Sequence, residues 1–581
     1  MAVQFIFGGS GRGKTYFLQH KIMEEAVNNP KKDYIMIVPE QFTMQTQKDM
    51  IKISPGHGIM NIDVQSFVRL AFRVFSETGA GNLPVLDDLG KIMILKKVLG
   101  QKKDELKYFG RNINKDGYIS EIKSFMSELI QYGADEDEIE RMIKASEKKP
   151  VLKYKLQDMS VAFKSFKEYI EKNYITSEEL LSVFADVVSQ SELLKGAVIC
   201  LDGFTGFTPL QYRLLRELIK TAEMVYVTVT ADDRESVINK GKNYQLFFMS
   251  RKTVHNIRQI ASETGVEVLD DIWTGKEIIQ TRFGESEELE WLERNLFRYP
   301  YKRYNKKNEV SDISCHVLKY AEDEVDFVVQ KIKGLLVGGC RYRDIAIVAG
   351  SLETYGSIIE HSMKKAGIAC FVDQKRGVQS SVPVRAIDAL LQIIIKDFAY
   401  EDVMDYLKSC LSWTSDSQND ILDNYLLATG IRGFKSWNRE WNTAYAYRRM
   451  TDESKDFANG VVENVRLGVL ENLSELYEKT AKGKHTVREY AASLFEFFER
   501  QHFYEKLMEF ADEYEENENF DMASEYRQLY GMVIEVFEKL VSLMGDEKMS
   551  LKEFKDILDV GFSEARIGVI PPGIDQVMAG D

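Results

Sequence analysis

The sequence predicts an α/β protein with two parallel-sheet cores, each of which carries a helical insertion. An apolar strand at the N-terminus leads directly into a glycine-rich loop and a helix, as at the start of a phosphate-binding α/β core. Short apolar runs at 34–39, 197–201 and 224–229 are typical of strands buried in a parallel sheet. Two long stretches, 84–195 and 398–560, show the three-to-four-residue apolar spacing of helices. The strands of one sheet must therefore flank a helical insertion.

Length and composition limit the class of protein. The chain has 581 residues, and its 76 basic and 91 acidic side chains give a formal charge of −15. A hydrophobic share of 44% excludes a mostly disordered chain, and the acidic balance argues against a histone-like coat of positive charge. No apolar run approaches the ~18 residues that cross a bilayer, and Met1–Phe7 has no basic region typical of a signal peptide. We therefore expect a cytoplasmic protein without a membrane partner.

The glycine-rich loop carries the clearest chemical signal. Its residues fit G-x-x-x-x-G-K-[ST]: Gly8, Gly9, Ser10, Gly11, Arg12, Gly13, Lys14 and Thr15. Glycines let the backbone N–H groups wrap closely around phosphate oxygens, and a helix starting at Lys14 adds the positive end of its dipole. We expect Lys14 to reach the β- and γ-phosphates of ATP and the Thr15 hydroxyl to coordinate Mg²⁺. The alternative is a glycine-rich turn without a ligand.

A second carboxylate-bearing strand is expected to complete the nucleotide site. The apolar run 197–201 ends at Asp202, where the ligands of open parallel sheets bind. Asp202 is predicted to hold Mg²⁺ through the nucleotide, although it could be an ordinary residue of a turn. Position 203 is Gly, where an active motor of this kind carries a Glu that prepares the attacking water. Nucleotide binding with slow or absent hydrolysis is therefore expected.

The order of the remaining elements predicts the domain boundaries. The run 34–39, followed by a helix-like segment, completes a βαβ unit of a RecA-like core after the P-loop. A second α/β unit is predicted from strands at 315–318, 344–348 and 370–372 with a helix at 324–336. The predicted domains are the first RecA-like core (1–83 and 196–297), a helical insertion (84–195), a second RecA-like core (298–397), a second helical insertion (398–562) and a return to the second core (563–581). This layout resembles that of a superfamily 1 helicase.

Specific motifs then allow a family to be named. The run Leu201–Gln211 resembles the D-E-F-Q-D-T-x-P-x-Q motif of UvrD-like helicases, with Gly203 in place of the Glu, and Val64–Arg69 resembles their T-F-H-S segment. The whole set is similar to the AddB family, which supplies one of the two subunits of bacterial AddAB helicase–nucleases. The segments that carry this resemblance are Gly8–Thr15, Val38–Thr43, Asp202–Gln211, Phe371–Arg376, Asn424–Ile431 and Pro571–Val577.

The resemblance implies a subunit of a machine that processes double-strand breaks for recombinational repair. In that family AddA is the motor and the partner in a heterodimer. AddB proteins are helicase-like scaffolds that bind single-stranded DNA, scan it for the Chi sequence and carry a nuclease domain and an iron–sulfur cluster. The sequence ends at Asp581, and its cysteines do not match the cluster pattern. We therefore expect neither nuclease activity nor a cluster in this chain.

The same resemblance implies a DNA-binding surface on the remnants of the helicase motifs. Carried over by position, it comprises Gln41, Thr43, Phe67, Arg69, Phe72, Phe204 and Phe207. These residue types suit the task, because aromatic rings stack on unpaired bases, amides and hydroxyls bond base edges, and arginine contacts phosphate or guanine. The alternative is that Phe67 and Phe72 belong to the core of a helix.

Three functions remain open from the sequence. The first is an ATP-binding, DNA-binding scaffold subunit whose own motor is degenerate. The second is an active ATP-dependent DNA helicase, in which Glu40 or Asp232 replaces the missing Glu. The third is a structural platform whose P-loop is a relic. Nucleotide binding separates the third from the others, and DNA-stimulated turnover separates the second from the first.

Overall fold

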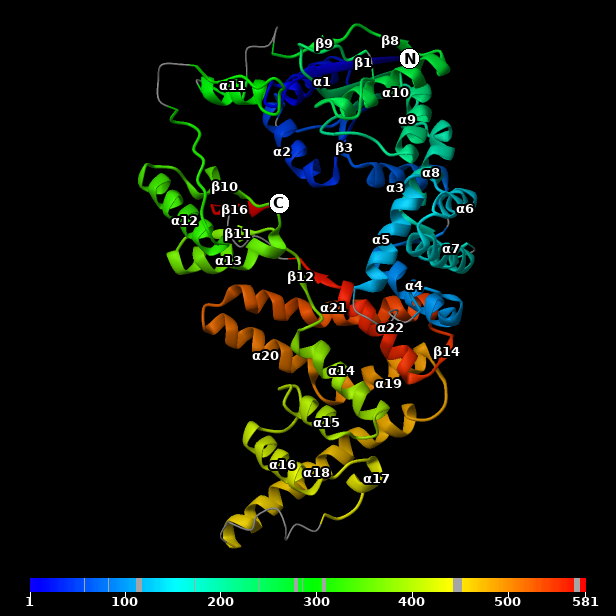
Figure 1. The fold of residues 1–581 in the computed structure, drawn as a ribbon, viewed down its shortest axis with the longest axis vertical. Helices are drawn as coiled ribbons and strands as arrows, with labels where there is room; N and C mark the ends of the chain where they lie inside the picture. Colours follow the sequence, from blue (N-terminus) through cyan, green and yellow to red (C-terminus); the bar gives the residue numbers. More distant parts are fainter. Residues whose placement is uncertain are drawn as a thin grey trace. The chain divides into compact units, whose positions relative to one another are not determined.

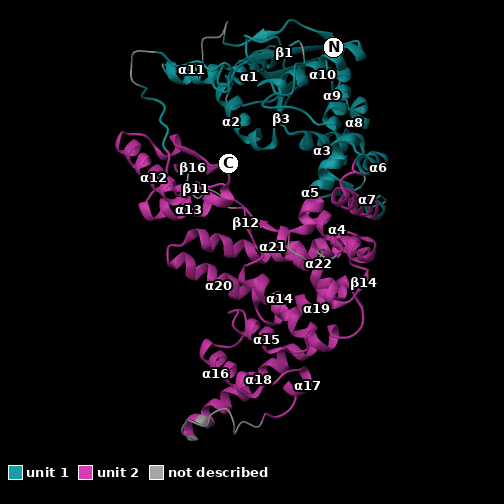
Figure 2. Cartoon of the chain, in the orientation of Figure 1, with its two compact units in different colours: residues 1–86, 125–145, 167–316 teal, residues 87–124, 146–166, 317–581 magenta. Residues whose placement is uncertain are grey.

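The chain folds into two compact units that are each discontinuous in sequence. The computed structural model describes all residues except 57, 82, 111–116, 172, 239, 276–280, 285, 306–309, 442–451 and 569–574 (Figure 1). The first unit comprises residues 1–86, 125–145 and 167–316, and the second comprises 87–124, 146–166 and 317–581 (Figure 2). The stretch predicted as one helical insertion, 84–195, is thus divided between the two units.

A seven-stranded parallel sheet is the centre of the first unit. Its strands are β1 (Ala2–Gly8), β2 (Tyr34–Ile37), β3 (Ile62–Gln65), β6 (Val198–Leu201), β7 (Met224–Thr230), β8 (Glu267–Val268) and β9 (Ile272–Trp273). The order is β3-β2-β6-β7-β1-β8, and β9 also pairs with β1. One strand, β7, therefore separates β1 from β6. Both faces are covered, which is why these segments read as continuous apolar runs.

Helices cover the two faces of this sheet with different apolar clusters. The helices of the first unit are α1 (Lys14–Asn28), α2 (Thr43–Ile53), α3 (Phe67–Thr78), α6 (Glu136–Ala145), α8 (Ser177–Val187), α9 (Pro209–Thr221), α10 (Phe248–Thr264) and α11 (Glu287–Asn295). On one face, Leu18 and Ile22 of α1 and Met50 of α2 pack on the strands. On the other face, α3, α8, α9 and α10 supply the apolar side chains. Loops follow the carboxyl ends of β1, β2 and β6.

Two short strands and two helices occupy the part of the sequence where the chain passes between the units. Strands β4 (Val85–Leu86) and β5 (Ile175–Thr176) pair in parallel. Helices α5 (Tyr118–Gln131) and α7 (Pro150–Ile170) each contain residues of both units.

The second unit combines a small parallel sheet with a large helical part. Strand β16 (Val577–Gly580) pairs in parallel with both β10 (Ala346–Val348) and β11 (Cys370–Val372), and helices α12 (Ala321–Val337) and α13 (Leu352–Ala366) pack on this sheet. The larger helices are α4 (Asp88–Gln101), α14 (Val382–Ile395), α15 (Tyr400–Leu407), α16 (Asp416–Thr429), α18 (Asp452–Thr480), α19 (Val487–Arg500), α20 (Phe503–Glu516), α21 (Phe520–Met544) and α22 (Leu551–Glu564). Short elements are α17 (Phe434–Trp437) and the paired strands β12 (Arg376–Gly377) with β15 (Arg566–Ile567) and β13 (His485–Thr486) with β14 (Lys548–Met549).

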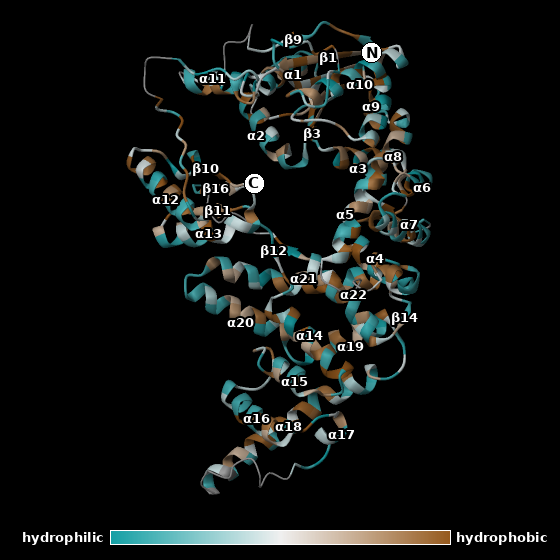
Figure 3. Cartoon of the chain, viewed as in Figure 1, coloured by the Kyte–Doolittle hydropathy of each residue, from teal (hydrophilic) through white to brown (hydrophobic). Residues whose placement is uncertain are grey.

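The predicted α/β class with parallel sheets is confirmed, and one predicted strand is wrong. Residues 315–318 form no strand, and Val317 is 94% exposed. A short run of this kind becomes a strand only when a neighbouring strand supplies its hydrogen bonds. In the observed sheet, β16 lies between β10 and β11. Apolar residues are concentrated in strands such as β1, while long helices such as α18 alternate between apolar and polar residues (Figure 3). Among the described residues, no helix is long and apolar enough to cross a membrane.

Candidate functional site

The glycine-rich loop connects β1 to α1 and has the backbone shape that its glycines permit. Gly11 and Gly13 have φ values of 68° and 78°, in the left-handed region that side chains with a Cβ rarely adopt. Helix α1 begins at Lys14, so its N-terminal end opens into the loop. The sequence-predicted strand, loop and helix are therefore all present in the structure, and the helix dipole points its positive end at the loop.

The ammonium group of Lys14 is folded back onto this loop. Its Nζ donates hydrogen bonds to the carbonyl oxygens of Gly8 at 3.0 Å and Gly9 at 2.8 Å. Burial lowers the pKa of Lys14 to about 8, although the carboxylates of Asp202 and Glu293 act in the opposite direction. A charge that is kept close to the loop and partly stripped of water is placed to accept an anionic partner.

Asp202 and Thr15 are brought together from positions 187 residues apart. The Thr15 hydroxyl donates to Asp202 Oδ1 at 3.2 Å, and the hydroxyl of Thr228 on β7 donates to the same oxygen at 2.6 Å. Asp202 is 5% exposed and follows β6 directly. The predicted Mg²⁺ pair of Thr15 and Asp202 thus has the oxygen ligands and the proximity that a Mg²⁺ ion shared with a nucleotide requires. Thr228 was missed from the sequence, although a threonine between the valines of a buried strand is a visible signal.

Helix α11 places two carboxylates over the glycine-rich loop. Glu293 Oε1 accepts the backbone N–H of Ser10 at 3.1 Å, and a Cβ on Gly9 would lie 2.4 Å from the same oxygen. Arg12 donates from Nη1 to Glu290 Oε1 at 2.8 Å, and its Nη2 lies 3.5 Å from Glu293 Oε2. The Glu293 carboxylate therefore accepts one of the backbone N–H groups of the loop. The sequence predicts that this loop binds phosphate. Sequence analysis missed Glu293, because its partners lie about 280 residues away.

The structure also places the residues that were considered as replacements for the missing Glu. Gly203 has a φ of 79°, so the turn after β6 itself requires a left-handed residue. Burial favours the neutral form of Asp232, but hydrogen bonds from Arg234 and the charge of Arg298 outweigh it and lower its pKa. Glu40 has a 61% exposed side chain with its Oε1 3.6 Å from Arg69 Nε. Asp232 is held in ion pairs, and Glu40 points into solvent.

The residues predicted to bind DNA fall into buried and exposed groups. Thr43 is 4% exposed, and its hydroxyl donates to the carbonyl oxygen of Glu40 at 2.8 Å, which fixes the start of α2. Gln41 is exposed, and the Arg69 side chain is 56% exposed. Of these, only Gln41 and Arg69 present polar groups to solvent.

The predicted phenylalanines divide in the same way. Phe67 is 6% exposed, whereas Phe72 is 48% exposed. The buried residues of α3 follow Phe67 at spacings of three, four, seven and eight, so the apolar stripe itself excludes Phe72. Phe204 and Phe207 are half-buried, with ring centroids 5.4 Å and 6.3 Å from that of Phe67. Phe42, missed from the sequence, is also 48% exposed and lies near Gly203.

Comparison with known proteins identifies the family. Residues 5–293 match the family model described as ADDB, N-terminal. The chain belongs to the AddB family. Three curated relatives, each named as a subunit of an ATP-dependent helicase/deoxyribonuclease, align with the whole chain. They come from Lachnoclostridium phytofermentans (40% identical), Acetivibrio thermocellus (32%) and Clostridium novyi (31%). The chain spans about half the length of these AddB relatives.

Proposed function

We propose that this chain is the ATP-binding and single-stranded-DNA-binding, helicase-like part of an AddB protein, whose own motor is degenerate. The observation that carries the proposal is the glycine-rich loop with Lys14 and Thr15, beside a buried Asp202 that is followed by glycine in place of a carboxylate. Lys14 and the loop N–H groups would hold the phosphates, and Thr15 with Asp202 would hold Mg²⁺. Bound Mg²⁺ would neutralise part of the phosphate charge.

Slow or absent hydrolysis follows from the surroundings of this site. An attacking water needs a carboxylate or amide to orient it, and position 203 offers none. Asp232 is a poor proton acceptor because its ion pairs with Arg234 and Arg298 lower its pKa. The second candidate function is an active ATP-dependent helicase. In that case the ion pairs of Asp232 would have to rearrange, so that its carboxylate could accept a proton from the attacking water.

The DNA contacts are proposed for the exposed and half-buried members of the predicted set. Phe72 offers a ring to an unpaired base, and Arg69 offers a guanidinium to a phosphate, because its exposed pair with Glu40 is weak. Phe204 and Phe207 rest on the buried Phe67, which would hold their rings in place. Gln41 could read base edges during Chi scanning.

The biological setting of the proposal comes from the names of the relatives. These name a component of an ATP-dependent helicase/deoxyribonuclease. We propose that this chain likewise acts in double-strand-break repair in the cytoplasm, in a heterodimer with the AddA motor.

Calorimetry with Mg-ATP, together with phosphate release in the presence of single-stranded DNA, tests the nucleotide part of the proposal. We expect binding that Lys14→Ala abolishes and no DNA-stimulated turnover. Robust stimulated turnover would favour the active helicase. Absence of binding would leave the P-loop as part of a structural platform.

DNA binding is tested with the same chain and a fluorescent oligothymidylate. Phe72→Ala is expected to weaken binding by about 1–3 kcal/mol if a base stacks on the ring. Arg69→Ala is expected to reduce the slope of log affinity against log salt by about 0.7. Tyr244→Ala is the matched control, because Tyr244 is an aromatic residue that is 76% exposed elsewhere in the same unit. Equal effects of Phe72→Ala and Tyr244→Ala would contradict the assignment.

A further inference from the structure

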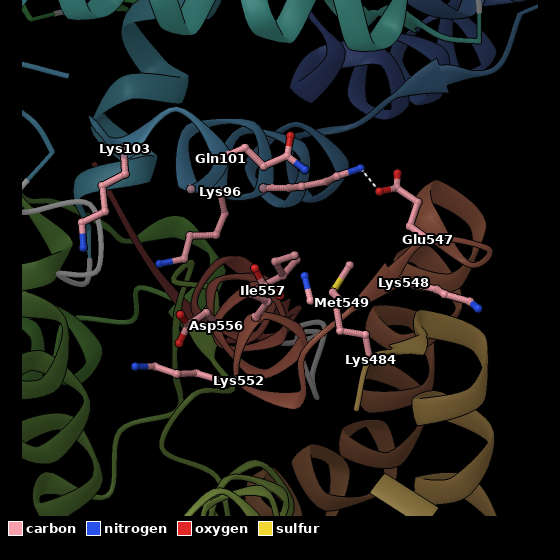
Figure 4. Close-up of a pocket in the computed structure, with 13 residues that line it drawn as sticks. Lys96, Gln101, Lys103, Lys484, Glu547, Lys548, Met549, Lys552, Asp556 and Ile557 are labelled. Carbon is pink, nitrogen blue, oxygen red and sulfur yellow. Dashed lines mark hydrogen bonds and ion pairs between the residues drawn. The ribbon is translucent and has the colours of Figure 1, made fainter. Parts of the chain in front are cut away.

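A cavity of 440 Å³ in the second unit is lined by lysines from three separate parts of the chain. It lies between α4, the β14 strand and the first turns of α22 (Figure 4). The lysines that line it are Lys96, Lys97, Lys103, Lys484, Lys548 and Lys552. None of them belongs to the nucleotide site or to the surface around Phe72, both of which are in the first unit.

Lysines outnumber carboxylates among the described residues that line the cavity. Among the residues that the structure describes, the carboxylates in the lining are Glu547, Glu553 and Asp556. Glu547 forms an ion pair with Lys97, and Glu553 accepts the backbone N–H of Ser550 at 2.8 Å, which caps α22. The cavity is thus a positively charged site in a chain of net charge −15. Like charges gathered in this way repel one another, and an anion bound among them relieves the repulsion.

The arrangement of the side chains indicates the kind of anion. Lys96 and Lys552 lie on either side of Asp556, with Lys103 nearby, whereas Lys484 lies beside Met549 (Figure 4). Lysines therefore approach the cavity from more than one direction, as is needed to contact several separated charges. Lysine acts as a point charge on a flexible stem, which suits single phosphates better than planar bidentate groups.

Apolar side chains form part of the same cavity wall. Met549 and Ile557 are 6% and 4% exposed. A ligand with spaced phosphates and less polar groups between them matches this combination of charged and apolar lining. The volume of 440 Å³ falls within the range of ligand pockets, about 300–1,000 Å³.

We propose that this lysine-lined cavity binds the backbone phosphates of a DNA strand, as a contact additional to the nucleotide site and the surface around Phe72. The inference rests on the proposed function, since it takes DNA as the ligand. The exposed lysines of the lining are Lys103, Lys484, Lys548 and Lys552. The contact is assigned to three of them, Lys484, Lys548 and Lys552.

The test compares two triple variants of the full chain. The cavity variant is Lys484→Ala, Lys548→Ala, Lys552→Ala, and the matched control is Lys331→Ala, Lys333→Ala, Lys364→Ala, which removes three exposed lysines from α12 and α13 of the same unit. Binding of a fluorescent oligothymidylate is measured by anisotropy over a range of salt concentrations. Three lost phosphate contacts reduce the slope of log affinity against log salt by about 2 for a single strand. We expect that reduction for the cavity variant alone.

Each outcome has a defined meaning. Equal salt slopes for the two variants, with wild-type binding intact and weakened in Phe72→Ala, would overturn this inference and leave the proposed function standing. Absence of DNA binding by the wild type would overturn both. Competition by a free nucleoside triphosphate in a Lys14→Ala background, lost in the cavity variant, would show that the cavity takes a free nucleotide and would also overturn the inference.

Discussion

The carboxylate of Glu293 lies at the glycine-rich loop, which the sequence predicts to bind phosphate. Replacing Glu293 tests whether this carboxylate competes with the phosphates of ATP. Glu293 accepts the Ser10 N–H at 3.1 Å and lies 3.5 Å from Arg12. The Glu293→Gln substitution keeps the size of the side chain and an oxygen acceptor but removes the negative charge. A bound triphosphate would then meet the same loop without a carboxylate at the Ser10 N–H.

The structure sets the scale of the effect. The Glu293 side chain is 19% exposed, so its charge is only partly screened by solvent. Two unit charges about 5 Å apart repel each other by about 3 kcal/mol at an effective dielectric constant of about 20. Because 1.4 kcal/mol is about tenfold in affinity, we expect the dissociation constant of Mg-ATP to fall by roughly tenfold to hundredfold.

Calorimetry at pH 7 is the assay, because Lys14, with a pKa of about 8, is then mostly protonated. The matched control is Glu288→Gln on the same helix, since Glu288 accepts the backbone N–H groups of Ser311 and Asp312 instead of any group in the loop. An affinity for Mg-ATP that is the same in wild type, Glu293→Gln and Glu288→Gln would refute the idea that Glu293 competes with phosphate.

Three other perturbations have defined outcomes. Mg-ATP affinity should fall as pH rises above about 8, because the lowered pKa of Lys14 lets it lose its proton there, and a flat calorimetric profile between about pH 6.5 and pH 9.5 would contradict this. Gly203→Glu should cost about 1–2 kcal/mol in urea unfolding without creating DNA-stimulated turnover, since φ is 79° at that position; turnover gained without loss of stability would be the opposite result. Asp158→Ala should lower the free energy of unfolding by about 2–4 kcal/mol, because Asp158 is 1% exposed and accepts three backbone N–H groups, from Lys107, Tyr108 and Phe109; Asp158→Asn should cost less.

Local sequence was sufficient for the nucleotide loop and for β1, β2, β6 and β7 of the first unit, whereas β3, β8 and β9 were not predicted. The conformation of the loop depends on glycines at the positions with positive φ, and those glycines are close together in the chain. The strand predicted at 315–318 failed because strands need partners, which a short apolar run does not reveal. The separation of Phe67 from Phe72 lay within reach of the sequence, since the stripe of α3 passes through one and misses the other.

The sequence by itself determined the features that depend on neighbouring residues: the strand–loop–helix at Gly8–Thr15, the buried strand before Asp202, and the absence of a carboxylate at Gly203. Tertiary structure alone decided the features that join distant segments. Thr15 meets Asp202 across 187 residues, Glu293 reaches Ser10 across 283, and the lysine-lined cavity is assembled from α4 and residues more than 380 positions later. Periodicity indicates which face of a helix or strand is buried. It does not indicate which side chain from a distant part of the sequence packs against that face. Packing of the whole chain sets those pairs.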